Sequence, residues 1–264
     1  MKNIITILLL TVMSGHIYSQ NIKKSELVFV NGKKLYYEVY GEGTPLFLLH
    51  GYSLSSQSWK PYVEKFEKDY KVYLVDLTGH GKSDPFKDDL SIKSVGEDIN
   101  ALVSYLNLEK VKAIGFSFGG DVLFQLALIN PSLIESMITI GAVGTWTVND
   151  FPQYQQVFTF ENRADFPWLE SSHQSDEQVK GIMNQFKNYT ISLSDIELQQ
   201  IQAEVMIMMG DDDEGMNFDE VARVKKNLRN SDVWILPDVS HSAHEGEHMY
   251  EFILKAKTFL SKTR

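Results

Sequence analysis

A serine stands between two glycines in the stretch GFSFG, residues 115–119. The apolar run 111–117 predicts a strand and residues 119–130 predict a helix, so Ser117 falls on a sharp strand-to-helix turn that small flanking residues permit. Such a turn lifts the hydroxyl above the sheet edge, and the free N–H groups of the helix N-terminus stabilise negative charge beside it. This context favours a nucleophilic serine over a glycine turn that serves only close packing.

Catalysis by Ser117 would need two further side chains from other parts of the chain. A serine hydroxyl is a poor nucleophile until a base removes its proton, so a histidine and an orienting carboxylate are required. Ligand sites in sheets of this kind lie beyond the carboxyl ends of the strands. Three aspartates, residues 211–213, follow the apolar run 204–210, and His241 follows the run 232–238. The residues alone leave the choice among the three aspartates open.

The elements that would position these residues are near-continuous apolar runs that alternate with segments of helical period. This alternation predicts an α/β fold, with a mostly parallel sheet of about eight strands and helices on both faces. Residues 26–41 predict an opening hairpin with its turn at Asn31-Gly32. The apolar runs are residues 45–51, 71–77, 111–117, 136–142, 204–210 and 232–238. The segments of helical period are residues 58–69, 91–108, 119–130, 218–230 and 246–260.

One segment breaks this alternation. Residues 145–200 contain no strand-like apolar run, and a structureless connection of that length is uncommon in a compact domain. We therefore predict a small, mainly helical cap insertion over residues 145–200, with residues 20–144 and 201–264 forming the core. Its aromatic residues could roof an apolar pocket, although packing together is the expected use for most of them: Trp146, Phe151, Tyr154, Phe158, Phe160, Phe166, Trp168, Phe186 and Tyr189.

The first residues have the layout of a secretory signal peptide. Lys2 precedes an apolar run, residues 4–13, and the small residue Ser19 closes the segment. The apolar run is too short to span a bilayer. We expect residues 1–19 to be removed on export, leaving a mature chain in the periplasm or outside the cell with no stable membrane insertion. The chain has no cysteine, so neither a disulfide framework nor a lipidated cysteine is expected.

Together these motifs resemble those of α/β-hydrolase-fold serine hydrolases, over essentially the whole chain after residue 19. The resemblance is carried by His50-Gly51-Tyr52, DLTGHGKSD at residues 76–84, the turn at Ser117, Gly210 to Asp213, and Pro237 to His241, in that order. It implies an esterase- or lactonase-like enzyme with a small helical cap and no cofactor.

The resemblance also assigns roles to individual residues. The family usually carries its acid three residues after the strand-ending glycine, which selects Asp213 and leaves Asp212 as the alternative. The backbone N–H groups of Tyr52 and Phe118 would hold the oxyanion of the tetrahedral intermediate. The side chains of Tyr52 and Phe118 would then be free to line an apolar acyl site.

Three further residues of these motifs have structural roles that the sequence leaves open. His50 is expected to hold its loop by hydrogen bonding rather than to transfer protons. Thr78 stands where the family often has an arginine, which leaves the anchoring of its loop open. Phe116 could line the pocket floor or pack beneath the sheet.

The predicted reaction is hydrolysis of a carboxylic ester of a small, largely apolar substrate. Ser117 would attack the carbonyl, His241 would remove and return the proton, and Asp213 would orient the imidazole. Lactones, thioesters and the carbon-carbon bonds of diketone-like substrates remain open, as does a non-enzymatic small-molecule receptor. Serine at the turn disfavours epoxide hydrolase and haloalkane dehalogenase chemistry, which uses an aspartate nucleophile in this superfamily.

Charge and ligand patterns exclude several other functions. The formal net charge of -10, with no basic cluster, disfavours nucleic acids and anionic membranes as partners. Residues 145–200 carry eight acidic and three basic side chains, which disfavours a strongly anionic substrate. His244 and His248 follow His241 without further convergent ligands, and residues 211–214 lack the pattern of a calcium loop, so no metal site is expected.

Overall fold

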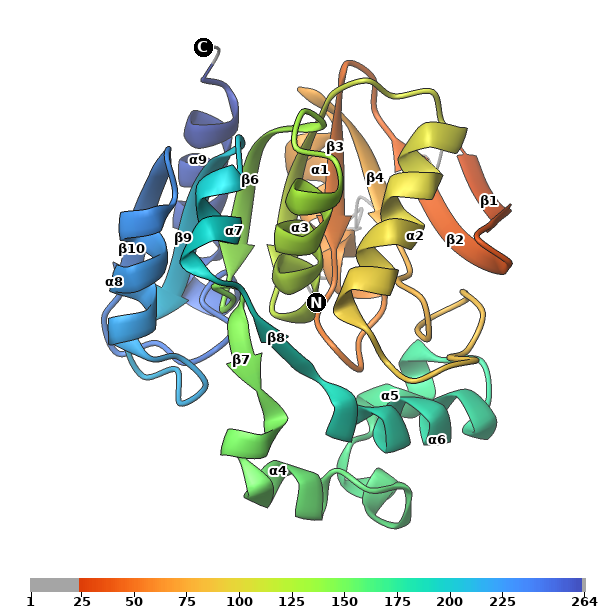
Figure 1. Ribbon diagram of the computed structural model, residues 1–264. Coiled ribbons are helices and arrows are strands. Elements are labelled where there is room, and N and C mark those ends of the chain that lie inside the picture. Colours follow the sequence, from red (N-terminus) through yellow and green to blue (C-terminus); the bar gives the residue numbers. More distant parts are fainter. Residues whose placement is uncertain (1–23, 263–264) are drawn as a thin grey trace, which may run out of the picture.

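The computed structural model describes residues 24–262, and the predicted signal segment, residues 1–19, lies outside them. The described chain contains an eight-stranded sheet of order β1-β2-β4-β3-β5-β6-β9-β10 (Figure 1). Strand β2 pairs antiparallel with β1 and β4, and the other pairings in this sheet are parallel. The predicted α/β fold is therefore confirmed. The strands are β1 (Lys24–Val30), β2 (Lys33–Tyr40), β3 (Thr44–Leu49), β4 (Tyr70–Val75), β5 (Val111–Phe116), β6 (Ile134–Ile140), β9 (Glu204–Gly210) and β10 (Ser231–Leu236).

The first two strands form the predicted hairpin. Val30 pairs with Lys33, so only Asn31 and Gly32 lie in the turn. Their φ angles are 49° and 77°. Two-residue hairpin turns of the commonest type require positive φ at both positions, which asparagine and glycine tolerate best.

Helices cover both faces of the sheet because successive strand residues point to opposite sides. In β3, Phe47 and Leu49 join the core on one face, whereas Leu46 and Leu48 join the core on the other. Figure 1 shows α2, α3 and α8 together on one side of the sheet. The first face packs on α2 (Ile92–Tyr105), α3 (Phe118–Ile129) and α8 (Phe218–Asn227), and the second packs on α1 (Lys60–Phe66) and α9 (Met249–Leu260).

A cap lies beyond the carboxyl ends of the parallel strands (Figure 1). It begins and ends with two short strands, β7 (Thr145–Thr147) and β8 (Thr190–Ser192), which pair antiparallel. The sequence gives no sign of β7 and β8, because three-residue strands are too short to show an alternating pattern. Between β7 and β8 lie 3-10 turns and the helices α4 (Pro152–Val157), α5 (Trp168–Ser172) and α6 (Asp176–Gln185).

Helix α7 (Asp195–Gln200), which the sequence analysis placed in the insertion, packs on the core. Leu198 is buried in the same cluster as the residues of α8. Gln199 Nε2 donates to Asn227 Oδ1 over 2.9 Å, and Arg223 forms an ion pair with Asp195. The chain has thus returned to the sheet before residue 200.

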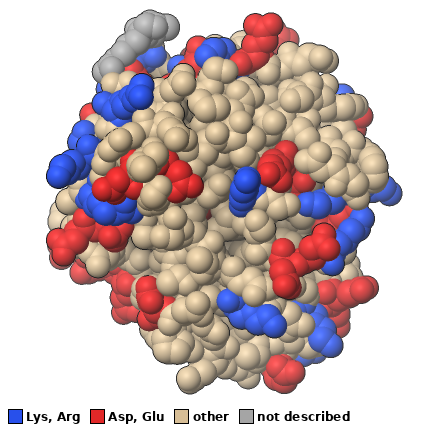
Figure 2. Space-filling view, in the orientation of Figure 1, with Lys and Arg blue, Asp and Glu red and all other residues tan. Residues whose placement is uncertain are grey.

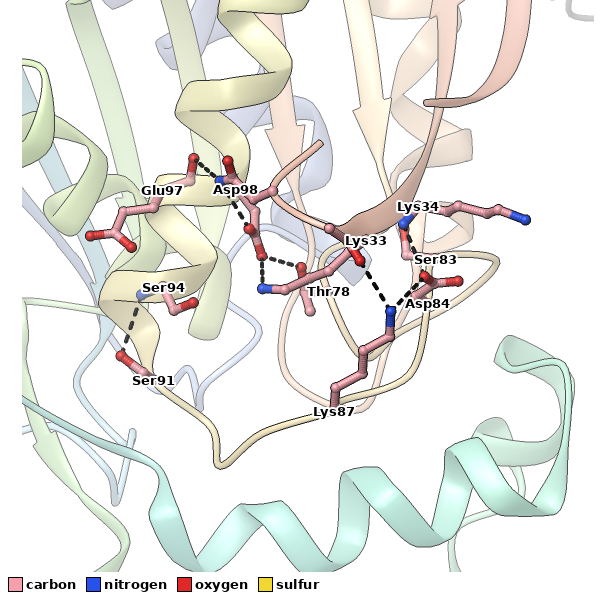
Figure 3. Close-up of polar contacts among 12 residues, drawn as sticks. Lys33, Lys34, Thr78, Ser83, Asp84, Lys87, Ser91, Ser94, Glu97 and Asp98 are labelled. Atoms are coloured by element: carbon pink, nitrogen blue, oxygen red, sulfur yellow. Dashed lines mark hydrogen bonds and ion pairs between the residues drawn. The ribbon is translucent and has the colours of Figure 1, made fainter. Parts of the chain in front are cut away.

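The loop after β4 is anchored to α2 through Asp98 (Figure 3). Thr78 Oγ1 donates to Asp98 Oδ2 over 2.6 Å, and Lys33 Nζ lies 2.6 Å from the same oxygen. Asp98 is buried, and a buried carboxylate is stable only when it is paired and hydrogen-bonded. Thr78 therefore anchors its loop without the arginine that is common in the family.

Acidic and basic side chains alternate over the visible face of the molecule, with no continuous basic patch (Figure 2). Over residues 24–262, none of the helices has the length and apolar character needed to cross a bilayer.

Candidate active site

Ser117 sits on a strained turn between β5 and α3. Its φ and ψ are 50° and -116°, a conformation that costs roughly 1 to 3 kcal/mol for a non-glycine residue. A Cβ at Gly115 would lie 2.4 Å from the carbonyl oxygen of Gly119, and a Cβ at Gly119 would lie 2.3 Å from that of Leu49. Larger residues cannot occupy either position without moving the backbone, which explains why glycines flank Ser117.

The structure brings Asp213 and His241 into contact at the carboxyl ends of β9 and β10. His241 Nδ1 lies 2.7 Å from Asp213 Oδ2, and the N–H of Gly215 donates to Asp213 Oδ1 over 3.0 Å. Asp213 is buried, whereas Asp212 is exposed. The carboxylate that faces His241 is therefore the one that the resemblance selected.

Ser117 and His241 line the same cavity. Within residues 24–262, no hydrogen bond joins their side chains. Nucleophile-to-base hydrogen bonds are often long in the absence of substrate, and rotation of the serine side chain changes its distance from the base. The serine, the histidine and the buried aspartate therefore line one cavity at the carboxyl edge of the sheet.

The ring of His241 packs on Phe116. The two ring centroids are 5.1 Å apart, and Phe116 also lies 4.8 Å from the ring of His244. Phe116 belongs to the core on the α1 and α9 face. Of the two roles left open for Phe116, packing is the one observed: its ring packs against His241 on the core side and does not line the cavity.

Tyr52 and Phe118, the two expected oxyanion donors, have different surroundings. Phe118 begins α3, so its N–H has no acceptor within the helix. Its side chain is fully buried in the core, and the expectation that it lines the acyl site was wrong. Tyr52 does line the cavity, and its hydroxyl donates to the carbonyl oxygen of Ile182 in the cap over 2.7 Å.

His50 holds neighbouring loops together, in line with its expected role. Its Nε2 accepts from the N–H of Leu77 over 3.0 Å, and its Nδ1 lies 2.8 Å from the carbonyl oxygen of Gly51. Burial lowers the pKa of His50 to about 4, so the ring is neutral at pH 7. His80, in the stretch DLTGHGKSD, had no role assigned from the sequence and likewise accepts from the N–H of Ser53 over 3.1 Å.

The cavity beside Ser117 has a volume of about 440 Å³. Four of the nine aromatic residues of the cap segment line it, and Phe158, Phe160 and Phe166 pack on an apolar cluster inside the cap. In the part of the chain that the structure describes, no group of three histidine or acidic side chains could hold a metal ion. The aromatic residues that line the cavity are Tyr52, Trp146, Tyr154, Phe186 and Tyr189.

Sequence reasoning missed Asp121, which also lines this cavity. It lies one helical turn after Ser117 on α3 and is 3% exposed. Tyr189 donates its hydroxyl to Asp121 Oδ2 over 2.8 Å, and the N–H of Gly144 lies 3.2 Å from Oδ1. The available signal was the single charged residue of a largely apolar helix, four residues after the candidate nucleophile.

Residues 44–193, more than half of the chain, match the alpha/beta hydrolase fold family, and the chain belongs to this family. Relatives include a soluble epoxide hydrolase of Corynebacterium sp. (strain C12), 32% identical over 114 residues that make up 43% of this chain and 40% of that protein. Another is the pimeloyl-[acyl-carrier protein] methyl ester esterase of Proteus mirabilis, 34% identical over 110 residues, or 41% of each chain. The chain spans less than half of the length of these relatives.

Solved structures share the fold over nearly the whole chain. The carboxylesterase CesB of Bacillus subtilis superposes with a TM-score of 0.76 and 18% identity, over 91% of this chain and 92% of that chain. The enol-lactonase of Burkholderia xenovorans LB400 also gives a TM-score of 0.76 and 18% identity, over 90% of this chain and all of that chain (100%). At such low identity these likenesses show the fold alone. The chain is thus an alpha/beta hydrolase whose substrate class the comparisons do not specify.

Proposed function

We propose that this protein is a serine hydrolase that cleaves a carboxylic ester of a small, largely apolar substrate. The observation that supports this most is the convergence of Ser117 with the Asp213–His241 pair on one aromatic-lined cavity. An epoxide hydrolase is among the relatives, but enzymes of that kind in this superfamily use an aspartate where this chain has Ser117.

The proposed reaction forms and then hydrolyses an acyl-enzyme. Ser117 Oγ attacks the ester carbonyl while His241 Nε2 takes its proton, and the leaving alcohol recovers that proton as the carbon-oxygen bond breaks. His241 then takes a proton from water, which attacks the acyl carbon, and returns it to Ser117 as the acid departs. Asp213 keeps the imidazole oriented through Nδ1 and stabilises its charged form.

The backbone supplies the stabilisation of the oxyanion in this proposal. The N–H of Phe118 lies at the N-terminus of α3, a helix of 12 residues, where the helix dipole favours negative charge. The N–H of Tyr52 is the second proposed donor. Loss of one such donor typically lowers kcat by about 10² to 10³.

A fluorophosphonate probe tests the nucleophile directly. The purified protein should label at a single serine, and labelling should vanish in Ser117→Ala. The control is Ser240→Ala, because Ser240 lines the same cavity beside His241. If the folded wild-type protein does not label, or if Ser117→Ala labels as well as Ser240→Ala, the proposal is wrong. A panel of nitrophenyl esters, lactones and thioesters then identifies the class of bond.

We also propose that the protein is exported and that residues 1–19 are removed. The motivating observation is the basic, apolar and small-residue order of that segment. Cell fractionation followed by N-terminal sequencing should find the mature chain starting at Gln20 outside the cytoplasm. Recovery of a cytoplasmic protein with Met1 intact would contradict this proposal.

A further inference from the structure

Asp121 is a buried carboxyl group beside the candidate nucleophile. It lies four residues after Ser117 on α3, and one turn of an α-helix rises about 5.4 Å. Its two hydrogen-bond donors, the Tyr189 hydroxyl and the N–H of Gly144, are both electrically neutral. They orient the carboxyl group at the cavity wall but bring no positive charge to it.

No lysine or arginine within residues 24–262 forms an ion pair with Asp121. Burial raises its pKa to about 7, and the bonds from Tyr189 and Gly144 and the nearby His241 only partly oppose this. A buried charge without a partner of opposite sign is costly, so a cation that enters the cavity would stabilise the ionised form.

The rest of the cavity wall suits a cation better than an anion. The described lining residues include no lysine or arginine, and Asp212 and Glu214 stand at the same cavity as exposed carboxylates. The ring centroids of Trp146 and Tyr189 are 4.8 Å apart, and those of Tyr52 and Tyr189 are 5.6 Å apart. Aromatic faces attract substituted ammonium groups through the charge distribution of their rings.

We propose that Asp121 and the aromatic rings around it form a subsite for a substituted ammonium group carried by the acyl part of the ester. The proposal rests on the proposed ester hydrolysis and narrows it to acyl chains that are largely apolar but end in a cation. Asp121 lies about one helical turn from Ser117, so the cation should lie about the same distance from the carbonyl carbon that Ser117 attacks. A chain of three methylene groups spans that distance.

Two nitrophenyl esters of matched shape test this subsite. One carries a 4-(trimethylammonio)butanoyl group and the other a 5,5-dimethylhexanoyl group, in which carbon replaces the charged nitrogen. The quantity to compare is the ratio of kcat/KM for the charged ester to that for the neutral ester, at pH 8. We expect Asp121→Asn to lower this ratio at least about tenfold relative to wild type, because only the charged ester loses a partner.

Asp211→Asn is the matched control, because it removes the same charge from an exposed position that does not line the cavity. A ratio that is unchanged in Asp121→Asn, or lowered equally by Asp211→Asn, overturns the subsite. Hydrolysis of neither ester by wild type, together with no fluorophosphonate labelling, would instead contradict the proposed hydrolase itself.

A second measurement needs no variant and stands even if Asp121→Asn does not fold. Choline and its uncharged isostere 3,3-dimethylbutan-1-ol are tested for protection of wild-type Ser117 against fluorophosphonate. We expect choline to protect at a concentration at least about tenfold lower, since the two differ only in charge. Equal protection by both compounds, or stronger protection by the neutral alcohol, would overturn the proposal.

Discussion

Replacement of Gly141 by alanine should misplace His241 without altering any proposed catalytic residue. Gly141 follows β6 with a φ of 61°, and an added Cβ would lie 2.7 Å from Cε1 and 2.8 Å from Nδ1 of His241. Carbon atoms pack favourably at about 3.5 to 4.0 Å, so the ring would have to move by about 1 Å.

The His241 ring cannot move this far without losing contacts that hold it in place. It is held by Asp213 at 2.7 Å on one side and by the ring of Phe116, with 5.1 Å between centroids, on another. A displacement of about 1 Å in a catalytic group can lower the rate about 100-fold. That factor corresponds to about 2.7 kcal/mol of transition-state stabilisation. We therefore expect kcat/KM to fall about 100-fold in Gly141→Ala.

Gly246→Ala is the control for backbone strain. Gly246 has the same φ of 61°, but an added Cβ there would meet no heavy atom within 4 Å. Both variants should lose about 1 kcal/mol of unfolding free energy in urea titrations, because both force an alanine into the left-handed region. Gly141→Ala should lose more than this, because its added Cβ also displaces the His241 ring. Only Gly141→Ala should lose turnover of nitrophenyl butyrate and react slowly with fluorophosphonate. Equal activity in the two variants would refute the assigned position of His241.

Three further predictions concern side chains around the site. Asp213→Asn should lower kcat about 10⁴-fold, the loss measured for the acid of a serine protease triad, whereas steady-state kinetics of Asp212→Asn should show a change below about threefold. Phe116→Ala should lower the free energy of unfolding by about 3 kcal/mol or more in urea titrations and also slow turnover, because the ring is buried against His241. Burial raises the pKa of Asp121 from its ordinary value of 3.8 to about 7, so the stability that its protonation contributes is present below pH 4 and is lost as the pH rises to 7. Urea unfolding from pH 4 to pH 8 should therefore change the stability difference between Asp121→Asn and wild type by about 4 kcal/mol in favour of the variant; a difference that is independent of pH would contradict the burial argument.

The turn that carries Ser117 and the strands around it could be predicted because they depend on residues close together in the sequence. The tight turn at Ser117 needs glycines within two residues on either side, and the steric contacts at Gly115 and Gly119 occur inside the same few residues or with the adjacent strand β3. The positions of the buried strands could also be anticipated, since buried parallel strands read as continuous apolar runs. Residues that follow such strands collect at one sheet edge, which is why the aspartates at residues 211–213 could be paired with His241 before the structure was known. The choice of Asp213 among them rested on the family resemblance.

The specificity of the cavity could not be predicted because it depends on residues that are distant in the sequence. Asp121 reads as the single charged residue of a largely apolar helix, and its partners Gly144 and Tyr189 lie 23 and 68 residues further along the chain. Tyr189 reaches the cavity only because β8 pairs with β7, and neither strand is long enough to show a period. The side chain of Phe118 shows the same limit, since its neighbour Ser117 fixes the position of its N–H but not the direction of its ring. In the proposed ester hydrolase, the cap would therefore decide which acyl group lies beside Ser117, and Asp121 on α3 is the feature of the cap-covered cavity from which we argue a substrate class.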